Sequence, residues 1–151
     1  MPKLKPFDGH GKDSWVDAVV LNTNILVSGM LSPSGPPGII LDWLRIGEIR
    51  LALDDRILGE YNEVLKRPHF RIPSEDTVTL IELIVSTASW PDIGSRHHIA
   101  LPDPDDEPFA ECAMAEGVPL VTGNIKHFPK SATKGIRILS PRQYVSERQG
   151  N

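Results

Sequence analysis

The strongest constraint on the fold of this chain is a regular alternation of short apolar runs with longer amphipathic stretches. Apolar runs of strand length occupy residues 18–21, 49–53, 118–122 and 136–139. Stretches with apolar residues at helical spacing begin near residues 36, 54, 74 and 106 and separate these runs. When a helix lies between two strands, the strands are usually parallel, because the helix carries the chain back across one face of the sheet. The sequence therefore predicts an α/β fold, a three-layer α/β/α arrangement with a mostly parallel central sheet.

The alternating pattern has the extent of one domain. It occupies residues 18–147, whereas residues 1–17 contain Pro and Gly without any apolar period and residues 148–151 are polar. We therefore predict a single domain between a loose N-terminal arm and a short tail. Of the 151 residues 40% are hydrophobic, which is enough apolar mass for one core.

Composition excludes several classes of protein. No apolar run approaches the roughly 18 residues that cross a bilayer, and the N-terminal residues lack the hydrophobic segment of a signal peptide. The one cysteine, Cys112, excludes an internal disulfide and suits a reducing compartment. We predict a cytoplasmic protein without a membrane partner, in which Cys112 packs in the core rather than acting as a nucleophile.

Two of the predicted helices are specified closely enough to be tested. Ser74 is predicted to cap the third helix, whose inward face is formed by Val78, Ile81, Ile84, Val85 and Ala88. Asp106 is predicted to stand at the start of the fourth helix, and Gly117 to end it.

Charge is distributed unevenly along the chain. The formal net charge of −4 argues against a protein that coats nucleic acid non-specifically. Residues 101–116 hold six acids and no Lys or Arg, whereas residues 126–148 hold six bases and a single acid, Glu147. This pattern fits a metal site beside a phosphate-holding surface, and it fits equally two solvated faces of opposite sign.

Polar residues follow the predicted strands at their carboxyl ends. Asn22 and Asn24 follow the first strand, and Thr122 and Asn124 follow a later one. In an open parallel sheet these ends share one edge, which is where ligands bind.

Acidic residues are predicted to reach the same edge. Asp103, Asp105 and Asp106 precede the fourth helix, and Glu60 flanks the apolar face of an earlier helix, whereas Glu63 points away from it. Carboxylates crowded in a partly buried cleft repel one another, and a hard divalent cation relieves this repulsion. The residues therefore fit metal-dependent phosphodiester chemistry; the alternative is that residues 103–106 only form a turn that caps a helix.

Four segments, in this order, resemble a known family. They are VVLNTNILVSG, ILGEYNEVLKRPHF, DPDDEPFAECAMAEG and LVTGNIKHF, and they lie between about residues 19 and 128. They are similar to the PIN-domain ribonucleases, and specifically to the VapC-like toxins of bacterial toxin–antitoxin systems. The resemblance implies that acids bind Mg²⁺ or Mn²⁺ and that a metal-activated water cuts RNA. It also implies a cognate antitoxin protein as partner, and a homodimer.

The family's site residues carry over to particular positions of this sequence. Glu60 matches the second acid of the family and Asp106 the third, with Asp103 and Asp105 as auxiliary acids. Asn124 stands where many members have a fourth acid.

Further residues are assigned supporting roles. Thr122 matches a hydroxyl residue that orients neighbouring side chains and waters, and Asn24 is placed beside it. Lys126, His127 and Arg67 are predicted to hold RNA phosphates; the alternative for each is ordinary surface charge.

Asn22 is the main departure from the family pattern, which has Asp at this position as its principal metal ligand. An amide is nearly isosteric with a carboxylate, so the fold should survive, but the substitution removes one negative charge from the metal site. Substitution to silence a toxic nuclease and natural divergence to a binding domain would both explain it. In either case we predict weak metal binding and little or no cleavage.

Three other functions are alternatives to this one. A non-catalytic PIN domain that binds RNA or an antitoxin is favoured by Asn22 and opposed by the retained acids. A phosphatase with an Asp nucleophile after the first strand is disfavoured, because neither Asn22 nor Asn24 can form an aspartyl phosphate. A dinucleotide-binding domain is disfavoured because no GxGxxG follows the first strand.

Overall fold

The structure is a computed structural model that describes residues 16–150. The strands are β1 (Asp17–Leu21), β2 (Ile49–Leu51), β3 (Leu120–Val121) and β4 (Ile138–Leu139). The α-helices of the described residues are α1 (Thr23–Leu31), α2 (Pro36–Arg45), α3 (Asp55–Leu65), α4 (Ser74–Thr87), α5 (Glu107–Glu116) and α6 (Pro141–Arg148). The loose arm predicted for residues 1–17 lies outside the described residues except for its last two, and so does Asn151 of the predicted tail.

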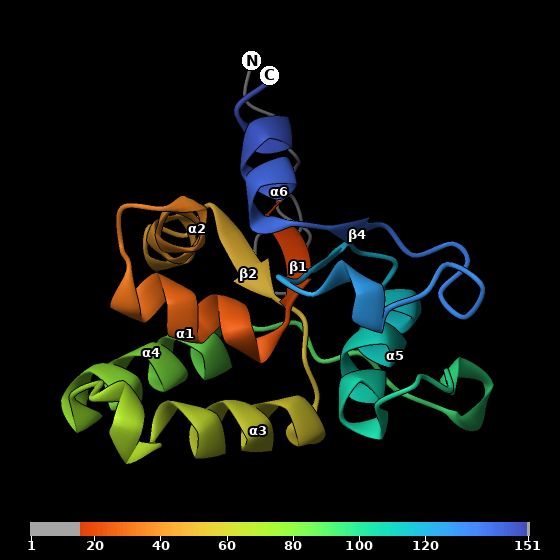
Figure 1. The fold of residues 1–151 in the computed structure, drawn as a ribbon, viewed down its shortest axis with the longest axis horizontal. Helices are drawn as coiled ribbons and strands as arrows, with labels where there is room; N and C mark the ends of the chain where they lie inside the picture. The colour runs from red at the N-terminus through yellow and green to blue at the C-terminus, as the bar shows by residue number, and fades with distance from the viewer. Residues whose placement is uncertain (1–15, 151) are drawn as a thin grey trace, which may run out of the picture.

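The central sheet has four strands in the order β2-β1-β3-β4, and every pair is parallel. Its helices enclose it as predicted: α2 packs on α1 and α6, and α4 and α5 contact β2, β1 and β3 (Figure 1). Val19 and Val20 of β1 and Leu51 at the end of β2 are completely buried. The predicted three-layer α/β fold is confirmed.

Short 3-10 helices connect the larger elements. They are η1 (Pro68–Phe70), η2 (Ser95–His97), η3 (Pro104–Asp106) and η4 (Ile125–His127). The last two flank the candidate site described below. No helix of the described residues is both long enough and apolar enough to traverse a bilayer.

Helix α1 is an element that the apolar pattern did not reveal. Ile25–Val27 are only a short apolar run after the first strand, yet they lie in a helix that begins at Thr23, with Asn22 as its N-cap. Most of α1 is buried, so its apolar residues surround the helix and leave no amphipathic period to recognise.

Helix α4 corrects two details of the sequence prediction. Ser74 is its first helical residue and the N-cap position belongs to Pro73, without a side-chain cap. Val78 and Val85 are 50% and 41% exposed, and the buried positions are Thr77, Leu80 and Ile84. The apolar residues of α4 cover more than one face, and its contacts with α3 and β2 decide which of them face inward.

Helix α5 begins and ends where the sequence predicts. Asp106 is its N-cap, and Gly117 is its C-cap with a φ of 72°, a left-handed conformation that glycine adopts without strain. Phe109, Ala110 and Ala113 are buried. The start of this helix is thus firmly placed, which matters because the acids of residues 103–106 precede it.

A glycine in α2 allows a close approach that gives a first test of the fold. A Cβ added at Gly38 would lie 2.0 Å from the carbonyl oxygen of Pro33, in the turn that joins α1 to α2. We expect Gly38→Ala to lower the free energy of unfolding by about 3 kcal/mol, because two backbone segments would have to separate. Denaturant unfolding followed by circular dichroism measures this change.

Gly59 supplies the matched control, since it also lies inside a helix but has no atom within 4 Å of the added Cβ. Gly59→Ala should raise the free energy of unfolding by about 0.5–1 kcal/mol, because alanine loses less conformational entropy in a helix. Equal destabilisation by both substitutions would contradict the packing described for Gly38.

Candidate active site

Two neighbouring strands end at the same edge of the sheet and deliver polar residues there. Leu21, the last residue of β1, is the register partner of Val121, the last residue of β3. The backbone N–H of Asn22 donates to the carbonyl of Val121 at 2.9 Å, which continues the ladder for one further residue. Asn22 and Thr122 therefore leave the sheet side by side, as the sequence predicts for a parallel sheet.

Side-chain hydrogen bonds join the two loops that follow these strands. The Asn22 side chain caps α1 by accepting from the N–H of Asn24 at 3.4 Å, and the Asn24 side chain accepts from the N–H of Gly123 at 3.4 Å. Thr122 Oγ1 accepts from the N–H of Asn124 at 3.0 Å. Asn24 and Thr122 thus hold the backbone at this edge, while the Asn124 residue is exposed.

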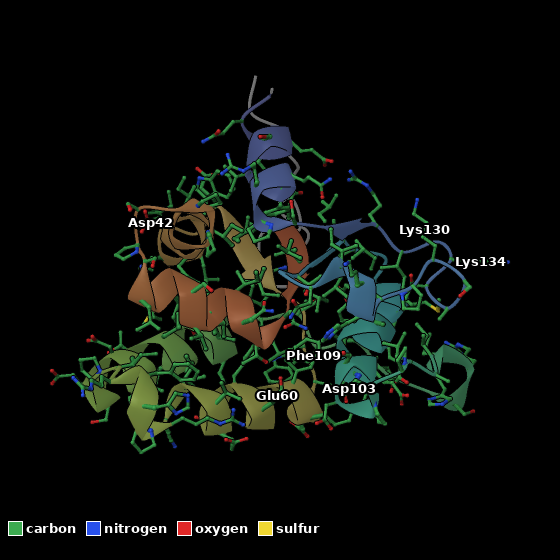
Figure 2. All side chains as sticks on the ribbon, viewed as in Figure 1. Asp42, Glu60, Asp103, Phe109, Lys130 and Lys134 are labelled. Atoms are coloured by element: carbon green, nitrogen blue, oxygen red, sulfur yellow. The ribbon has the colours of Figure 1, made fainter. Side chains whose placement is uncertain are left out.

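Glu60 reaches the same edge from α3. The hydroxyl of its neighbour Tyr61, which is fully buried, donates to the carbonyl of Leu21 at 2.6 Å and ties α3 to the end of β1. Thr23 Oγ1, at the start of α1, donates to Glu60 Oε2. Glu60 is half-buried and Glu63 is exposed, which agrees with their predicted orientations. In Figure 2, Glu60 lies on the side of α3 that faces α1.

The aspartates of residues 103–106, which precede α5, also lie near this edge. Asp103 caps η3 by accepting from the N–H of Asp105 at 2.9 Å. Asp106, whose side chain is 13% exposed, pairs with His127 of η4, with its Oδ2 3.1 Å from His127 Nδ1. The contact between Asp106 and His127 joins the start of α5 to the loop that contains Asn124. Figure 2 shows Asp103 beside the start of α5.

The pKa values show that Glu60 and the aspartates share one electrostatic environment. Burial raises the pKa of Glu60, the negative charges of Asp105 and Asp106 raise it further, and the Thr23 hydrogen bond opposes both effects. Burial also raises the pKa of Asp106, the charge of Asp103 adds to it, and His127 opposes it. The edge therefore concentrates more negative charge than its neighbours neutralise.

The structure thus brings together Asn22, Glu60, Asp106 and the loop of Asn124, which come from four separate parts of the chain. Their oxygen donors, carboxylates and an amide, are of the type that Mg²⁺ and Mn²⁺ prefer. Carboxylates whose charges raise one another's pKa values are a setting that a divalent cation would stabilise, and among the described residues no three of these acids have oxygens within 4.8 Å of one another. The donor set therefore fits a hard cation, with amides at Asn22 and Asn124 where the resemblance implies carboxylates.

The three predicted phosphate-binding residues lie in different settings. Arg67 forms a two-pronged ion pair with Glu63, at 2.8 and 2.9 Å, on the exposed side of α3. The hydrogen bond from Arg67 to Glu63 raises the pKa of Arg67, and the negative charge of Glu60 raises it further. His127 contacts Asp106, and Lys126 is exposed. Arg67 is thus engaged by a carboxylate, whereas Lys126 extends into solvent.

A second group of acids, separate from Glu60 and the aspartates of residues 103–106, was not predicted from the sequence. Ligand atoms of His98, Glu107 and Glu111 lie within 4.8 Å of one another, and within residues 16–150 no other three His, Cys, Asp or Glu side chains meet this spacing. Glu111 is 3% exposed and pairs with Arg56 at 2.8 Å, while it accepts from the N–H of Ile99 at 3.0 Å. These contacts already satisfy the carboxylate, so the cluster is structural.

The role of this second cluster is to fix the loop that carries the site's aspartates. Glu111 binds His98 and the backbone of Ile99, and Glu107 Oε2 accepts from the N–H of Leu101 at 3.0 Å. Residues 98–101 are thereby attached to α5 just before Asp103. A charged residue at a buried position of α5, between Ala110 and Cys112, is the sequence signal that would have revealed Glu111.

Cys112 has no catalytic setting. It is completely buried in α5, and burial raises its pKa to about 12, so its thiol stays protonated at neutral pH. The prediction that Cys112 is a packing residue is confirmed.

Comparisons with known proteins agree with this architecture. A family model described as PIN domain matches residues 18–126. Among curated proteins, none is similar enough to this chain to match.

Solved structures share the fold at low sequence identity. VapBC2 from Rickettsia felis, bound to a DNA fragment from its promoter, is 18% identical, with a TM-score of 0.53 over 82% of this chain and 98% of its own. FitAB bound to the IR36 DNA fragment is 17% identical, with a TM-score of 0.56 over 82% of this chain and 94% of its own. PAE2754 from Pyrobaculum aerophilum is 14% identical, with a TM-score of 0.55 over 90% of this chain and 91% of its own. This likeness shows the fold alone.

The second cluster leads to a stability test with a defined pH dependence. Burial by itself would raise the pKa of Glu111, but hydrogen bonds from Ile99, Arg56 and His98 lower it below its usual value. Glu111→Gln should therefore lower the free energy of unfolding at neutral pH by about 1–3 kcal/mol, because Arg56 loses a buried charged partner. Denaturant titrations over a pH series measure this difference.

The sign of the pH effect follows from linkage. A carboxyl whose pKa is lower in the folded state stabilises the protein above its unfolded pKa and loses this effect as the pH falls through its folded pKa. The difference between wild type and Glu111→Gln should therefore shrink towards acid pH. Asp42→Asn, at an exposed pair with Arg45, is the control and should change stability little. A difference that grows on acidification would contradict the described pairing.

At Glu60 we expect the opposite effect: removal of the negative charge should stabilise the protein. Glu60→Gln removes a charge that burial and neighbouring aspartates disfavour, and it keeps an oxygen that accepts from Thr23. We expect the free energy of unfolding to rise by about 0.5–2 kcal/mol without added divalent metal. Glu63→Gln, on the exposed side of the same helix, should not stabilise. Thermal unfolding in a chelator measures both variants, and a lower melting temperature for Glu60→Gln would contradict the crowding of charge.

Proposed function

The chain belongs to the PIN domain family, and from this membership and its acidic edge we propose that it is a metal-dependent endoribonuclease. In this proposal it is the toxin component of a toxin–antitoxin pair, and Asn22 weakens its cleavage. The observation that carries the proposal is the convergence of Glu60 and Asp106. They lie 46 positions apart in the sequence, and the charge of Asp106 raises the pKa of Glu60 at the carboxyl edge of the sheet.

Glu60 and Asp106 would hold Mg²⁺ or Mn²⁺, with Asp103 and Asp105 as auxiliary acids and the Asn22 side-chain oxygen as a weaker donor. When bound, such a cation lowers the pKa of a water and stabilises negative charge on a phosphodiester. Hard cations take oxygen ligands and tolerate retained waters, which suits a site with few carboxylates.

The remaining residues position these acids. The Thr23 hydroxyl donates to Glu60 and fixes its carboxylate relative to the end of β1. His127 holds Asp106 from η4, and Thr122 holds the backbone of Asn124. An RNA phosphate brought to this edge would meet oxygen donors on α3 and α5 and basic residues on η4.

Asn22 is the weak point of this site as a catalyst. Its side-chain oxygen is already used to cap α1, and an amide adds no charge to balance a divalent cation. An aspartate could cap the same helix, since Asp and Asn are comparable N-cap residues, and would add the missing charge. The fold therefore accepts either residue, while cation affinity distinguishes them.

The proposed partners follow from the fold. The resemblance to VapC-like toxins implies a cognate antitoxin, and the similar VapBC2 and FitAB structures are bound to DNA fragments. We propose that this chain likewise binds a cognate antitoxin protein, cuts RNA, and forms a homodimer in the cytoplasm.

A second candidate function is a PIN domain that binds RNA or an antitoxin without cutting. Asn22 favours it, because the principal carboxylate of the family pattern is missing at the end of β1. Binding of single-stranded RNA that is equally tight in Mg²⁺ and in chelator, together with absent cleavage, would support this function over the first.

The proposal predicts a gain of function on a single substitution. Asn22→Asp should raise the rate of RNA cleavage in Mg²⁺ or Mn²⁺ by about 10- to 100-fold, a range typical of altered metal-site residues. A labelled single-stranded RNA resolved on a denaturing gel measures the rate, and added chelator should abolish it.

The matched control removes either Glu60 or Glu63 in the Asn22→Asp variant. Asn22→Asp combined with Glu60→Gln should lose the gained activity, whereas Asn22→Asp combined with Glu63→Gln should keep it. If Asn22→Asp folds, binds RNA and still does not cut with either metal, the ribonuclease proposal is wrong.

A further inference from the structure

The connection between β3 and β4 is a basic segment that starts at the candidate site. Since β3 and β4 are parallel, residues 122–137 run from the carboxyl edge of the sheet, beside Asn124, to its opposite edge. No Asp or Glu occurs between residues 117 and 146. Lys126, Lys130 and Lys134 lie in this connection at intervals of four residues, and all three are exposed. We call these three residues the lysine stripe.

The lysine stripe is free of carboxylate partners within residues 16–150. Five arginines of the described residues pair with acids, and they are Arg45, Arg56, Arg67, Arg137 and Arg148. Lys126, Lys130 and Lys134 have no hydrogen bond or ion pair with any residue of the described range. Three ammonium groups on one connection are therefore available to an anionic ligand.

The backbone beneath the stripe is held in place by its own contacts. Phe128 is 2% exposed and anchors the segment in the core. The buried Thr133 donates from Oγ1 to the carbonyl of Pro129 at 3.0 Å and accepts at its carbonyl from the N–H of Ile136 at 3.1 Å. Gly135, with a φ of 85°, makes the turn towards β4. The lysines thus project from a defined frame; Figure 2 shows Lys130 and Lys134 at the outer side of the molecule.

We propose that the lysine stripe is a phosphate track for single-stranded RNA that leads from the acidic site along the β3–β4 connection. This inference rests on the proposed function and specifies how its substrate is held. The acids at the edge repel an RNA backbone, so a substrate needs compensating cations nearby. Lys126 lies two residues after Asn124, and His127 contacts Asp106, so the stripe is continuous with the site.

RNA fits the stripe better than a protein partner does. Lysines hold phosphates as point charges without reading bases, whereas protein interfaces depend on apolar or aromatic anchors at their centre. Ile125, which is 42% exposed, is the one large apolar side chain exposed among residues 124–137. The stripe therefore offers charge to a partner but little apolar surface.

Binding measured without divalent metal tests the stripe apart from cleavage. A short fluorescein-labelled oligouridylate is titrated with the protein in chelator, and fluorescence anisotropy is followed over a salt series. The combined variant Lys126→Gln, Lys130→Gln, Lys134→Gln should bind about 10-fold more weakly than wild type at low salt. The slope of log affinity against log salt should become shallower by about 2, since each neutralised phosphate of a single strand contributes about 0.7.

A control variant removes the same charge elsewhere. The three bases are exposed: Lys66 is the C-cap of α3, Arg96 lies in η2 and Arg142 lies in α6. Their combined change to Gln should leave the salt slope close to that of wild type. Equal losses for both variants would mean that only net charge matters, and an unchanged lysine variant would also overturn the proposal.

Two further outcomes separate this proposal from its alternatives. If the lysine variant binds RNA normally but loses binding to a labelled oligoglutamate peptide, the stripe is a docking surface for an acidic protein and the proposal is wrong. If Asn22→Asp fails to cut RNA while the lysine variant still loses RNA affinity and salt slope, the phosphate track stands and the ribonuclease proposal fails.

Discussion

The hydrogen bond from Tyr61 to the carbonyl of Leu21 is the contact on which the acidic edge depends. Leu21 ends β1, so this bond attaches α3 at the point where the chain leaves the sheet towards Asn22. Tyr61 is completely buried, and a buried hydroxyl or carbonyl without its partner costs about 1–3 kcal/mol. Because Glu60 is the preceding residue, the requirement to satisfy Tyr61 also positions the carboxylate that Thr23 binds. Core packing and site geometry are therefore both set by this one contact between distant parts of the chain.

Helix α5 and its N-cap hold two acids whose pKa values are shifted in opposite directions. Glu111, in the middle of α5, is buried and fully paired with Arg56, His98 and the backbone of Ile99, and these partners lower its pKa. Asp106, at the N-cap, pairs with His127, and its pKa is raised, mainly by burial. The fold thus neutralises the acid that holds a loop in place and leaves excess negative charge where a cation would bind. Such an imbalance costs stability, and natural proteins tolerate that cost mainly at functional sites.

Sequence reasoning succeeded where the responsible interactions are local. The alternation of strands and helices, the capping position of Asp106 and the left-handed Gly117 all depend on residues close together in the chain. The convergence of Asn22 with Thr122 could also be anticipated, because parallel strands share their carboxyl edge.

Sequence reasoning failed where a distant partner decides. The buried face of α4 depends on its contacts with α3 and β2, and apolar residues on several faces left its orientation ambiguous. The role of Glu111 depends on Arg56, which lies 55 residues earlier. Helix α1 was missed because it is buried on most sides and so lacks an amphipathic period. In each case the deciding information is a contact in three dimensions.

The separation of charge along the chain acquires a spatial meaning in the fold. The acids of residues 103–106 lie at the carboxyl edge, α5 leads back across the sheet, and β3 returns to the same edge at Thr122. The basic connection begins there, so acids and bases that are separated in sequence meet at Asp106 and His127. The net charge of −4 is therefore a poor guide to affinity for nucleic acid, because a phosphate backbone responds to the local arrangement of charge. A cation at the acidic end and lysines along the connection would together present a continuous positive path, which neither segment provides alone.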